Sequence, residues 1–293
     1  MLPLAQLVLV LVSTPTLPRL ICSDVDGTLL TPSHEVTDRT VATVLRAMDH
    51  VPFCACTGRS RAGAYNVLGP IGNRLRREKA AGVFLNGLQA FGPDNELLLD
   101  VLLPPAIVEE VADFAVEHSE ALVAFSGDRI LTNKRDQWTD LLVTYRDATP
   151  EVVGAWRDIA AMEPVNKLIV LAPKEHVAAL RPLLAACLGS RASITQAIPE
   201  MLEVLPAGGS KGAGVRALLK HTGIPAASTL AIGDAENDLG MLQLCGVSVA
   251  MGNAAAEVKR IADFESATNA AGEDGGALAI ERHFLNLLRL PDP

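Results

Sequence analysis

Apolar and polar residues alternate along the chain in blocks that predict strands and helices taking turns. Short runs of almost only apolar residues, such as residues 19–23 and 51–56, are typical of buried strands. Between these runs, apolar side chains recur at helical spacing, and Thr37 stands where it can cap the predicted helix. A strand, a helix and a strand in this order predict a parallel sheet with covering helices. The pattern continues with a strand at residues 82–85 and, near the C-terminal end, with a helix at 212–221, a strand at 228–232, a helix at 238–244 and a strand at 247–250.

The middle of the chain has a different pattern. Two strands follow each other at residues 121–125 and 129–132, and paired strands beside helices are typical of an α+β module. Since the parallel-sheet pattern brackets this module on both sides, we predict that the module is an insertion. Its other expected elements are strands at residues 97–103, 167–171, around 194 and at 202–205, and helices at 104–118 and 174–188.

The predicted fold is therefore of the α/β class, with a Rossmann-like, doubly wound parallel-sheet core and an inserted α+β cap domain. We assign the core to residues 19–87 and 207–293, the cap to residues 88–206, and an apolar N-terminal extension to residues 1–18. The composition agrees with a folded chain, because 49% of the 293 residues are hydrophobic and 20% are charged.

Charge and composition exclude several classes of function. The chain has 25 Lys and Arg against 34 Asp and Glu, a formal net charge of −9, and only 4% aromatic residues. Nucleic-acid binders need clustered basic side chains and aromatic stacking platforms, so we predict no nucleic-acid partner. Five cysteines, an odd number without a C-x-x-C pair, indicate a reduced intracellular protein, and we expect a cytoplasmic one.

Residues 1–12 are almost wholly apolar. A bilayer-spanning helix needs about 20 apolar residues, so we predict no stable membrane span. The run could form the centre of a signal peptide, but no Lys or Arg precedes it and no clear small-residue cleavage site follows. Two interpretations stay open: an extra strand or loose extension, and a segment for organelle targeting or secretion.

The strongest chemical signal is D-V-D-G-T-L-L at residues 24–30, directly after the first predicted strand. Side chains two residues apart on an extended chain point to the same side, so Asp24 and Asp26 face together. Ligands of open α/β sheets bind at the carboxyl ends of the strands. There, one carboxylate can attack as a nucleophile while the other transfers a proton. The alternative is a solvated acidic turn, which fits a lone D-x-D better than this longer motif.

Two further stretches supply groups that can hold an anion. In C-A-C-T-G-R-S, Thr57 and Gly58 stand where the second strand meets a glycine turn, which offers a hydroxyl and backbone N–H groups. In G-G-S-K-G, Lys211 begins a predicted helix, and a lysine there makes sense if it and the helix end hold a phosphate together. The alternatives are a helix cap for Thr57 and a surface loop for Lys211. We interpret Cys54 and Cys56 as core residues.

The fourth stretch, G-D-A-E-N-D at residues 233–238, again follows an apolar strand. Asp234, Asn237 and Asp238 supply oxygen ligands of the kind that Mg²⁺ takes, although the same residues could cap the next helix. Together the four stretches offer a nucleophile, an acid/base, a hydroxyl, a cation and a carboxylate pair for a metal. Phosphoryl transfer to a carboxylate needs this set of groups.

The order D-V-D-G-T-L-L, T-G-R, S-K-G, G-D-x-x-N-D resembles the haloacid dehalogenase-like superfamily. More narrowly, it is similar to the Cof-type phosphatases, whose large α/β cap is inserted between the Thr and Lys motifs. N-G at residues 86–87 and an Asn- and Gly-rich loop at residues 267–279 match that subgroup as well, so the resemblance spans roughly residues 19–284. The chain departs from the pattern at Ala235, where the subgroup often has Gly, and in its apolar leader.

The resemblance implies roles in phosphate chemistry. Asp24 would take the phosphoryl group as an aspartyl-phosphate. Asp26 would protonate the leaving oxygen and then activate water. Thr57, Gly58 and Lys211 would hold the phosphate oxygens and offset developing charge.

The resemblance also implies a magnesium site. Mg²⁺ would lie between Asp24, the backbone carbonyl of Asp26, and Asp234, with Asp238 acting mainly through water. Asn237 would contact the phosphate or a metal-bound water. Two carboxylates beside a dianionic phosphate require such a cation on electrostatic grounds.

We therefore expect a Mg²⁺-dependent phosphatase that hydrolyses a small phosphorylated metabolite, such as a sugar phosphate or a phosphorylated cofactor. The alternatives are a phosphomutase or phosphotransferase, in which a second hydroxyl replaces water, and a catalytically silent binding module. Candidate substrate contacts are Arg59, which we expect to bridge core and cap, Asn86, and Lys167, for which the alternative is protection of a sheet edge. The sequence identifies neither the substrate nor the oligomeric state.

Overall fold

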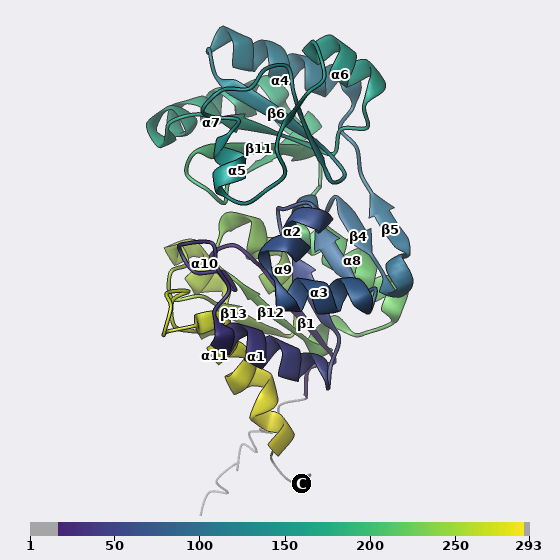
Figure 1. Cartoon of the computed structure of the whole chain (residues 1–293), viewed down its shortest axis with the longest axis vertical. Helices are drawn as coiled ribbons and strands as arrows, with labels where there is room; N and C mark the ends of the chain where they lie inside the picture. The colour runs from purple at the N-terminus through teal and green to yellow at the C-terminus, as the bar shows by residue number, and fades with distance from the viewer. Residues whose placement is uncertain (1–16, 290–293) are drawn as a thin grey trace, which may run out of the picture.

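An eight-stranded sheet forms the lower part of the computed structural model, which describes residues 17–289 (Figure 1). From β14 to β3 neighbouring strands run parallel, while β4 and β5 join one edge as antiparallel strands. The predicted α/β class with a Rossmann-like core is confirmed. The strands lie in the spatial order β14 (Phe264–Glu265), β13 (Val247–Ala250), β12 (Thr229–Gly233), β1 (Leu20–Ser23), β2 (Phe53–Cys56), β3 (Gly82–Phe84), β4 (Gln89–Phe91) and β5 (Leu97–Asp100).

Helices cover both faces of this sheet. Parallel crossovers are right-handed, and the chain winds outward from β1 and from β12 in opposite directions, so the two sets of crossover helices lie on opposite faces. One set is α1 (Asp38–Met48), α2 (Arg61–Val67) and α3 (Pro70–Arg77), and the other is α9 (Leu239–Leu244) and α10 (Ala256–Ile261). In addition, α8 (Lys211–Thr222) packs against α9, and α11 (Gly275–Ile280) packs against α1.

The central strands form because their sequences are apolar almost without interruption. Every residue of β1, β2 and β12 is buried, as expected for parallel strands that are covered on both faces. Cys22 pairs with Cys54 across β1 and β2, and both are free thiols in the packed core, as is Cys56. The predicted cap of α1 is confirmed, since the Thr37 side chain accepts the backbone N–H of Thr40.

A six-stranded sheet with its own helices forms the upper part of Figure 1. Its neighbouring strands are antiparallel except for the parallel pair β7 and β8. The strand order is β10 (Ala192–Thr195), β11 (Met201–Pro206), β9 (Lys167–Leu171), β6 (Ala121–Ser126), β7 (Arg129–Thr132), β8 (Glu151–Val152). The helices are α4 (Pro105–Glu117), α5 (Leu141–Thr144), α6 (Trp156–Met162) and α7 (Lys174–Leu188), of which α4 and α6 lie farthest from the larger sheet and α5 lies near it (Figure 1).

The segment predicted as the cap, residues 88–206, begins with two strands that belong to the larger sheet. The chain turns back after β3, so that β4 pairs with β3 and β5 pairs with β4. We expected a strand at residues 97–103 and none at residues 89–91, because such short runs do not reveal their pairing partners. The division into core and cap stays a proposal. We now propose that the cap begins near Leu103, because the backbone N–H of Leu103 is bonded to the carbonyl of Val165, next to β9.

The predicted N-terminal extension, residues 1–18, lies outside the described residues except for its last two. Its role as an extension or a targeting segment stays a prediction. Among the helices of residues 17–289, none combines the length and the apolar character that crossing a lipid bilayer requires.

Gly87 determines how closely the turn after β3 approaches the start of α8. Its φ is +88°, and a Cβ at this position would lie 2.0 Å from the carbonyl oxygen of Ser210. We predict that Gly87→Ala lowers the free energy of unfolding by roughly 3 kcal/mol, because a backbone clash adds to the cost of positive φ. Gly223→Ala is the matched control, since Gly223 has a φ of +67° and no atom within 4 Å of such a Cβ. It should cost about 1 kcal/mol, and equal losses for both variants in urea unfolding would contradict the prediction.

Candidate active site

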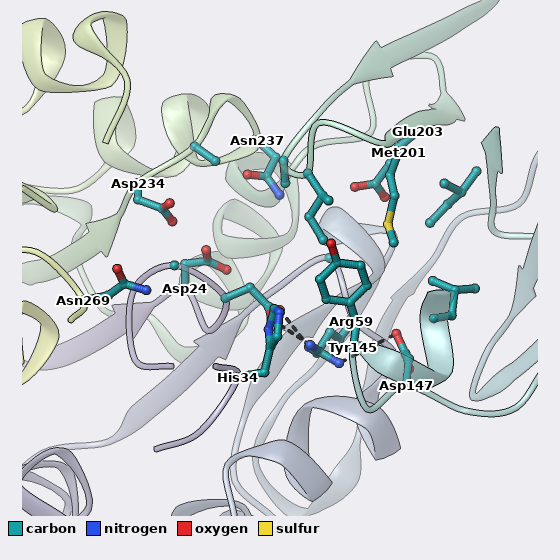
Figure 2. Close-up of a pocket in the computed structure, with 18 of the residues that line it drawn as sticks. Asp24, His34, Arg59, Tyr145, Asp147, Met201, Glu203, Asp234, Asn237 and Asn269 are labelled. Atoms are coloured by element: carbon teal, nitrogen blue, oxygen red, sulfur yellow. Dashed lines mark hydrogen bonds and ion pairs between the residues drawn. The ribbon is translucent and has the colours of Figure 1, made fainter. Parts of the chain in front are cut away.

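The polar motif residues gather at the carboxyl ends of the parallel strands. Asp24 directly follows β1, Thr57 follows β2, Asp234 follows β12, and Lys211 is the first residue of α8. Because the carboxyl ends of parallel strands meet at one edge of a sheet, residues far apart in the sequence converge there. In Figure 2, Asp24 and Asp234 lie close together on one side of a pocket, and Glu203 of the cap lies on the other side.

Lys211 is fully buried between two carboxylates. Its Nζ donates hydrogen bonds to Oδ1 of Asp24 at 2.6 Å and to Oδ1 of Asp238 at 2.8 Å. Burial by itself lowers the pKa of Lys211, but Asp238 and Asp24 outweigh burial and raise that pKa above its ordinary value. Lys211 is therefore a fixed cation behind Asp24.

Asp238 uses both carboxylate oxygens within the protein. Oδ1 accepts the hydrogen bond from Lys211, and Oδ2 accepts the backbone N–H groups of Asp234 and Ala235, each at 3.0 Å. The side chain is fully buried. Asp238 thus orients Lys211 and shapes the loop that carries Asp234.

Asp24, Asp234 and Asp238 form an acidic cluster, with one oxygen of each within 4.8 Å of the others. Burial, followed by the charge of Asp238, raises the pKa of Asp24 well above its ordinary value and raises the pKa of Asp234 to about 7. A divalent cation would relieve this repulsion, and carboxylate oxygens are the ligands that Mg²⁺ prefers. The donor set therefore fits the predicted metal.

Gly27 allows the loop after β1 to lie against Asp234. Its φ is +73°, and a Cβ at this position would lie 2.3 Å from Oδ2 of Asp234. Asp234 is held on both oxygens, because Thr28 donates to Oδ1 at 3.2 Å and Asn253 donates to Oδ2 at 3.3 Å. Any side chain at residue 27 would displace this carboxylate.

Asp26 is paired with Arg59. The guanidinium donates from Nε to Oδ2 and from Nη2 to Oδ1, both at 2.7 Å. Burial opposes ionisation of Asp26, but Arg59 holds the pKa of Asp26 well below its usual range. Arg59 also lies 3.9 Å from Oδ2 of Asp147, so it contacts both the core and the cap, as its predicted bridging position requires.

A pocket of about 320 Å³ lies between the core and the cap. Its cap side includes the apolar and aromatic side chains of Phe125, Ile169 and Met201. The acidic cluster and the pair of Asp26 and Arg59 lie at its core side (Figure 2). The predicted site residues that line the pocket are Asp24, Asp26, Gly58, Arg59, Lys167, Asp234 and Asn237.

The other predicted residues lie directly behind this wall. Lys211 is bonded to Asp24, and Asp238 is bonded to Lys211 and to the backbone of the pocket-lining loop that carries Asp234. Thr57 is fully buried, and its Oγ1 accepts the backbone N–H of Arg59 at 3.1 Å. Asn86 is also fully buried and contacts Asn237.

Sequence reasoning missed several residues that line the pocket. His34 and Tyr145 meet edge to face across it, with ring centroids 4.7 Å apart, and Asp147 and Glu203 contribute carboxylates from the cap. Glu203 had a signal, since it is the one charged residue in the otherwise apolar run M-L-E-V-L-P. His34 and Asp147 have none, because their positions depend on how the cap meets the core, and the helical spacing of Tyr145 from Trp138 favours a core residue of the cap.

A family model described as haloacid dehalogenase-like hydrolase matches residues 21–280. The chain belongs to the haloacid dehalogenase-like hydrolase family. The resemblance that the motifs indicated is thereby confirmed, and the protein is a hydrolase of this family.

Named relatives of this hydrolase include proteins from plants and bacteria. It is 33% identical over 267 residues to the protein named endoribonuclease YBEY, chloroplastic, of Arabidopsis thaliana, which covers 89% of this chain but only 45% of the relative's own length. An HMP-PP phosphatase of Cronobacter sakazakii is 32% identical over 247 residues, which cover 80% of this chain and 85% of that one. The crystal structure of a haloacid dehalogenase-like hydrolase from Bacteroides thetaiotaomicron aligns with a TM-score of 0.78 at 27% identity, covering 91% of this chain and all of that one (100%).

The double use of Asp238 makes its substitution costly in this hydrolase. Asp238→Asn replaces one accepting oxygen by an amide that faces either Lys211 or two backbone N–H groups. We predict that the free energy of unfolding falls by roughly 3 kcal/mol. Asp49→Asn is the control, because Asp49 pairs with Arg74 at the surface and should cost less than about 1 kcal/mol. Similar losses for the two variants in denaturant unfolding would contradict the assigned role of Asp238.

Proposed function

We propose that this hydrolase is a Mg²⁺-dependent phosphatase that acts on a small phosphorylated metabolite through an aspartyl-phosphate on Asp24. The observation that carries the proposal is the position of Lys211, which bonds Asp24 on one side and leaves its carboxylate facing a pocket. A charged lysine behind a carboxylate offsets the negative charge of an approaching phosphate. The HMP-PP phosphatase relative supports the same class of reaction.

In the first step, an oxygen of Asp24 forms a bond to phosphorus while the bond from phosphorus to the ester oxygen breaks. The electron pair leaves with the ester oxygen, which takes a proton. In the second step, water attacks the phosphorus, the bond to Asp24 breaks, and inorganic phosphate forms. The turn at Gly58 holds the phosphate oxygens in both steps, with Thr57 directly behind it, and Lys211 offsets their charge from behind Asp24.

Asp26 is the proposed proton carrier for both steps. Its pairing with Arg59 favours the ionised carboxylate, which suits the removal of a proton from the attacking water. Protonation of the leaving oxygen requires Asp26 to carry a proton, so the pair with Arg59 must loosen during that step. Arg59 can turn toward Asp147, which already lies 3.9 Å away.

Asp24 and Asp234 are the proposed side-chain ligands of Mg²⁺, together with the backbone carbonyl of Asp26. When bound, the ion neutralises the carboxylates and the phosphate dianion. Asp238 was predicted to act mainly through a metal-bound water. Since both of its oxygens are bonded within the protein, we now propose that it acts through Lys211 and the loop of Asp234.

The proposed substrate is a phosphorylated cofactor or a similar metabolite with an apolar part. Phe125, Tyr145 and Met201 present apolar and aromatic surface to the pocket, which a ligand rich in hydroxyl groups would not match. We propose a cytoplasmic location with an organelle as the alternative, since the Arabidopsis relative has chloroplastic in its name and residues 1–12 are apolar.

The nucleophile can be tested with a near-isosteric change. We predict that Asp24→Asn lowers phosphate release from p-nitrophenyl phosphate roughly a thousandfold or more, because an amide does not attack phosphorus. Asp94→Asn, at an exposed turn, should retain wild-type activity. Asp24→Asn turnover equal to that of the wild type would remove the proposed mechanism.

The metal can be tested by removal and return. We predict that chelation by EDTA abolishes phosphate release and that Mg²⁺ restores it. In the same samples, Mg²⁺ should raise the thermal unfolding midpoint by a few degrees, because it relieves repulsion between Asp24 and Asp234. Asp234→Asn should lose most of this shift. Full activity in chelator, with no metal detected by elemental analysis, is the result that rules out the ion.

A further inference from the structure

One acceptor oxygen in the pocket wall has no partner. Within residues 17–289, the buried side-chain atoms without a hydrogen-bond partner are His34 Nδ1, Arg59 Nη1, the hydroxyl of Tyr65 and Asn237 Oδ1. His34 Nδ1 and Arg59 Nη1 each lie within 4.0 Å of a carboxylate, Asp26 and Asp147 respectively. Tyr65 does not line the pocket, so Asn237 Oδ1 is the orphaned acceptor of the site.

The orientation of Asn237 is fixed by a chain of hydrogen bonds that begins in the cap. Glu203, in β11, accepts Nδ2 of Asn86 at 2.9 Å, and Oδ1 of Asn86 accepts Nδ2 of Asn237, also at 2.9 Å. A carboxylate paired with a lysine only accepts hydrogen bonds. Glu203 therefore selects the amide orientation of Asn86, and Asn86 selects that of Asn237.

The cap anchors this chain with a buried ion pair. Lys167 donates to the same oxygen of Glu203, Oε2, that Asn86 uses, and it also donates to the carbonyl of Gly58 at 2.8 Å. Both Lys167 and Glu203 are at most 5% exposed. One pair of cap side chains thus contacts both the turn at Gly58 and the hydrogen-bonded amides of Asn86 and Asn237.

The core leaves Asn86 little room for other positions. A Cβ at Gly58 would lie 3.1 Å from its Oδ1, and the backbone N–H of Asn86 is bonded to the carbonyl of Thr57 at 3.0 Å. Its amide can still rotate in place, since the two ends of an amide have nearly the same shape. Hydrogen-bond partners, rather than packing, decide which end faces Asn237.

We propose that Glu203 is a positioning residue, which acts from the cap through Asn86 to hold the amide oxygen of Asn237 toward Asp24 and Asp234. Figure 2 shows the amide oxygen of Asn237 turned to the side of the pocket where these carboxylates lie. There it accepts a hydrogen bond from an O–H or N–H group, such as a bound water. Phosphate oxygens are acceptors themselves, so the predicted contact of Asn237 with phosphate is the less suitable of its two expected roles. The catalytic consequence rests on the proposed phosphatase activity, whereas the amide orientation does not.

Two variants of Glu203 distinguish the effect of its hydrogen-bond-accepting oxygen from the effect of its negative charge. Glu203→Gln keeps a side-chain oxygen, and because both donors share Oε2, one oxygen is enough to hold Asn86 and Lys167. Glu203→Leu has a similar size and no acceptor. Arg181→Met is the matched control, since Arg181 forms a different ion pair between cap and core, with Glu236 at 2.6 Å. If Glu203→Leu does not fold, the double variant Lys167→Met/Glu203→Leu removes the buried charges together.

The first measurement is ¹⁵N NMR of the asparagine side-chain amides in the free protein. The signals of Asn86 and Asn237 are assigned from the variants Asn86→Leu and Asn237→Leu. Their exchange with water should be slow in the wild type, in Glu203→Gln and in Arg181→Met, and roughly tenfold faster or more in Glu203→Leu. Unchanged exchange in Glu203→Leu, or equal loosening in Glu203→Gln, would overturn the proposal.

The second measurement is hydrolysis of p-nitrophenyl phosphate. We expect kcat to fall roughly tenfold in Glu203→Leu with little change in KM, and to stay within about twofold of the wild type in Glu203→Gln and Arg181→Met. Altered amide exchange with unaltered kcat would overturn the positioning role. If the wild type releases no phosphate from any ester, the proposed function is wrong. Altered amide exchange in Glu203→Leu would then still support the proposed orientation of Asn86 and Asn237.

Discussion

A lysine buried between two aspartates is the interaction on which the rest of the site depends. Lys211 begins α8, Asp24 follows β1 and Asp238 lies beyond β12, so one ammonium group ties three elements together. Each of these charges would be costly to bury alone, and removing one partner leaves the others uncompensated. With Asp234 included, three carboxylates face one ammonium group. Burial, followed by this excess of negative charge, raises the pKa values of Asp24 and Asp234, and the excess makes the site suitable for a cation.

The two aspartates of the motif D-V-D-G-T-L-L have different surroundings, which shift the pKa values of their carboxyl groups in opposite directions. Asp24 lies among other carboxylates, and burial together with Asp238 raises its pKa. Asp26, two residues later, is bonded to Arg59 through both oxygens, and its pKa is lowered. Groups whose environments push their pKa values apart are suited to different steps of one reaction. The local sequence places both side chains on one side of the chain, but Arg59 and Asp238 create the difference.

The parts of this molecule that sequence predicts well are those in which a local pattern and its chemistry coincide. An apolar run followed at once by acids locates Asp24 and Asp234, because a buried strand must end where polar groups begin. Lys211 stands out because a cation at a helix N-terminus needs a reason. A strand at β5 was expected within the cap and none was expected at β4, because a short run of residues does not reveal its long-range pairing partner. Glu203 and Asp147 were missed as site residues because their partners Asn86 and Arg59 are distant in the sequence, and only the folded cap brings them together.

Polar contacts between cap and core accompany the aromatic contact of His34 and Tyr145 at the site. Arg181 pairs with Glu236, Arg59 lies beside Asp147, and Lys167 bonds the carbonyl of Gly58. The pair of Arg181 and Glu236 is partly exposed and contributes little free energy, whereas Arg59 and Lys167 are buried, so separating them from their partners costs more. The pocket is lined by both parts, so its shape depends on the contacts that hold the smaller sheet against the larger one.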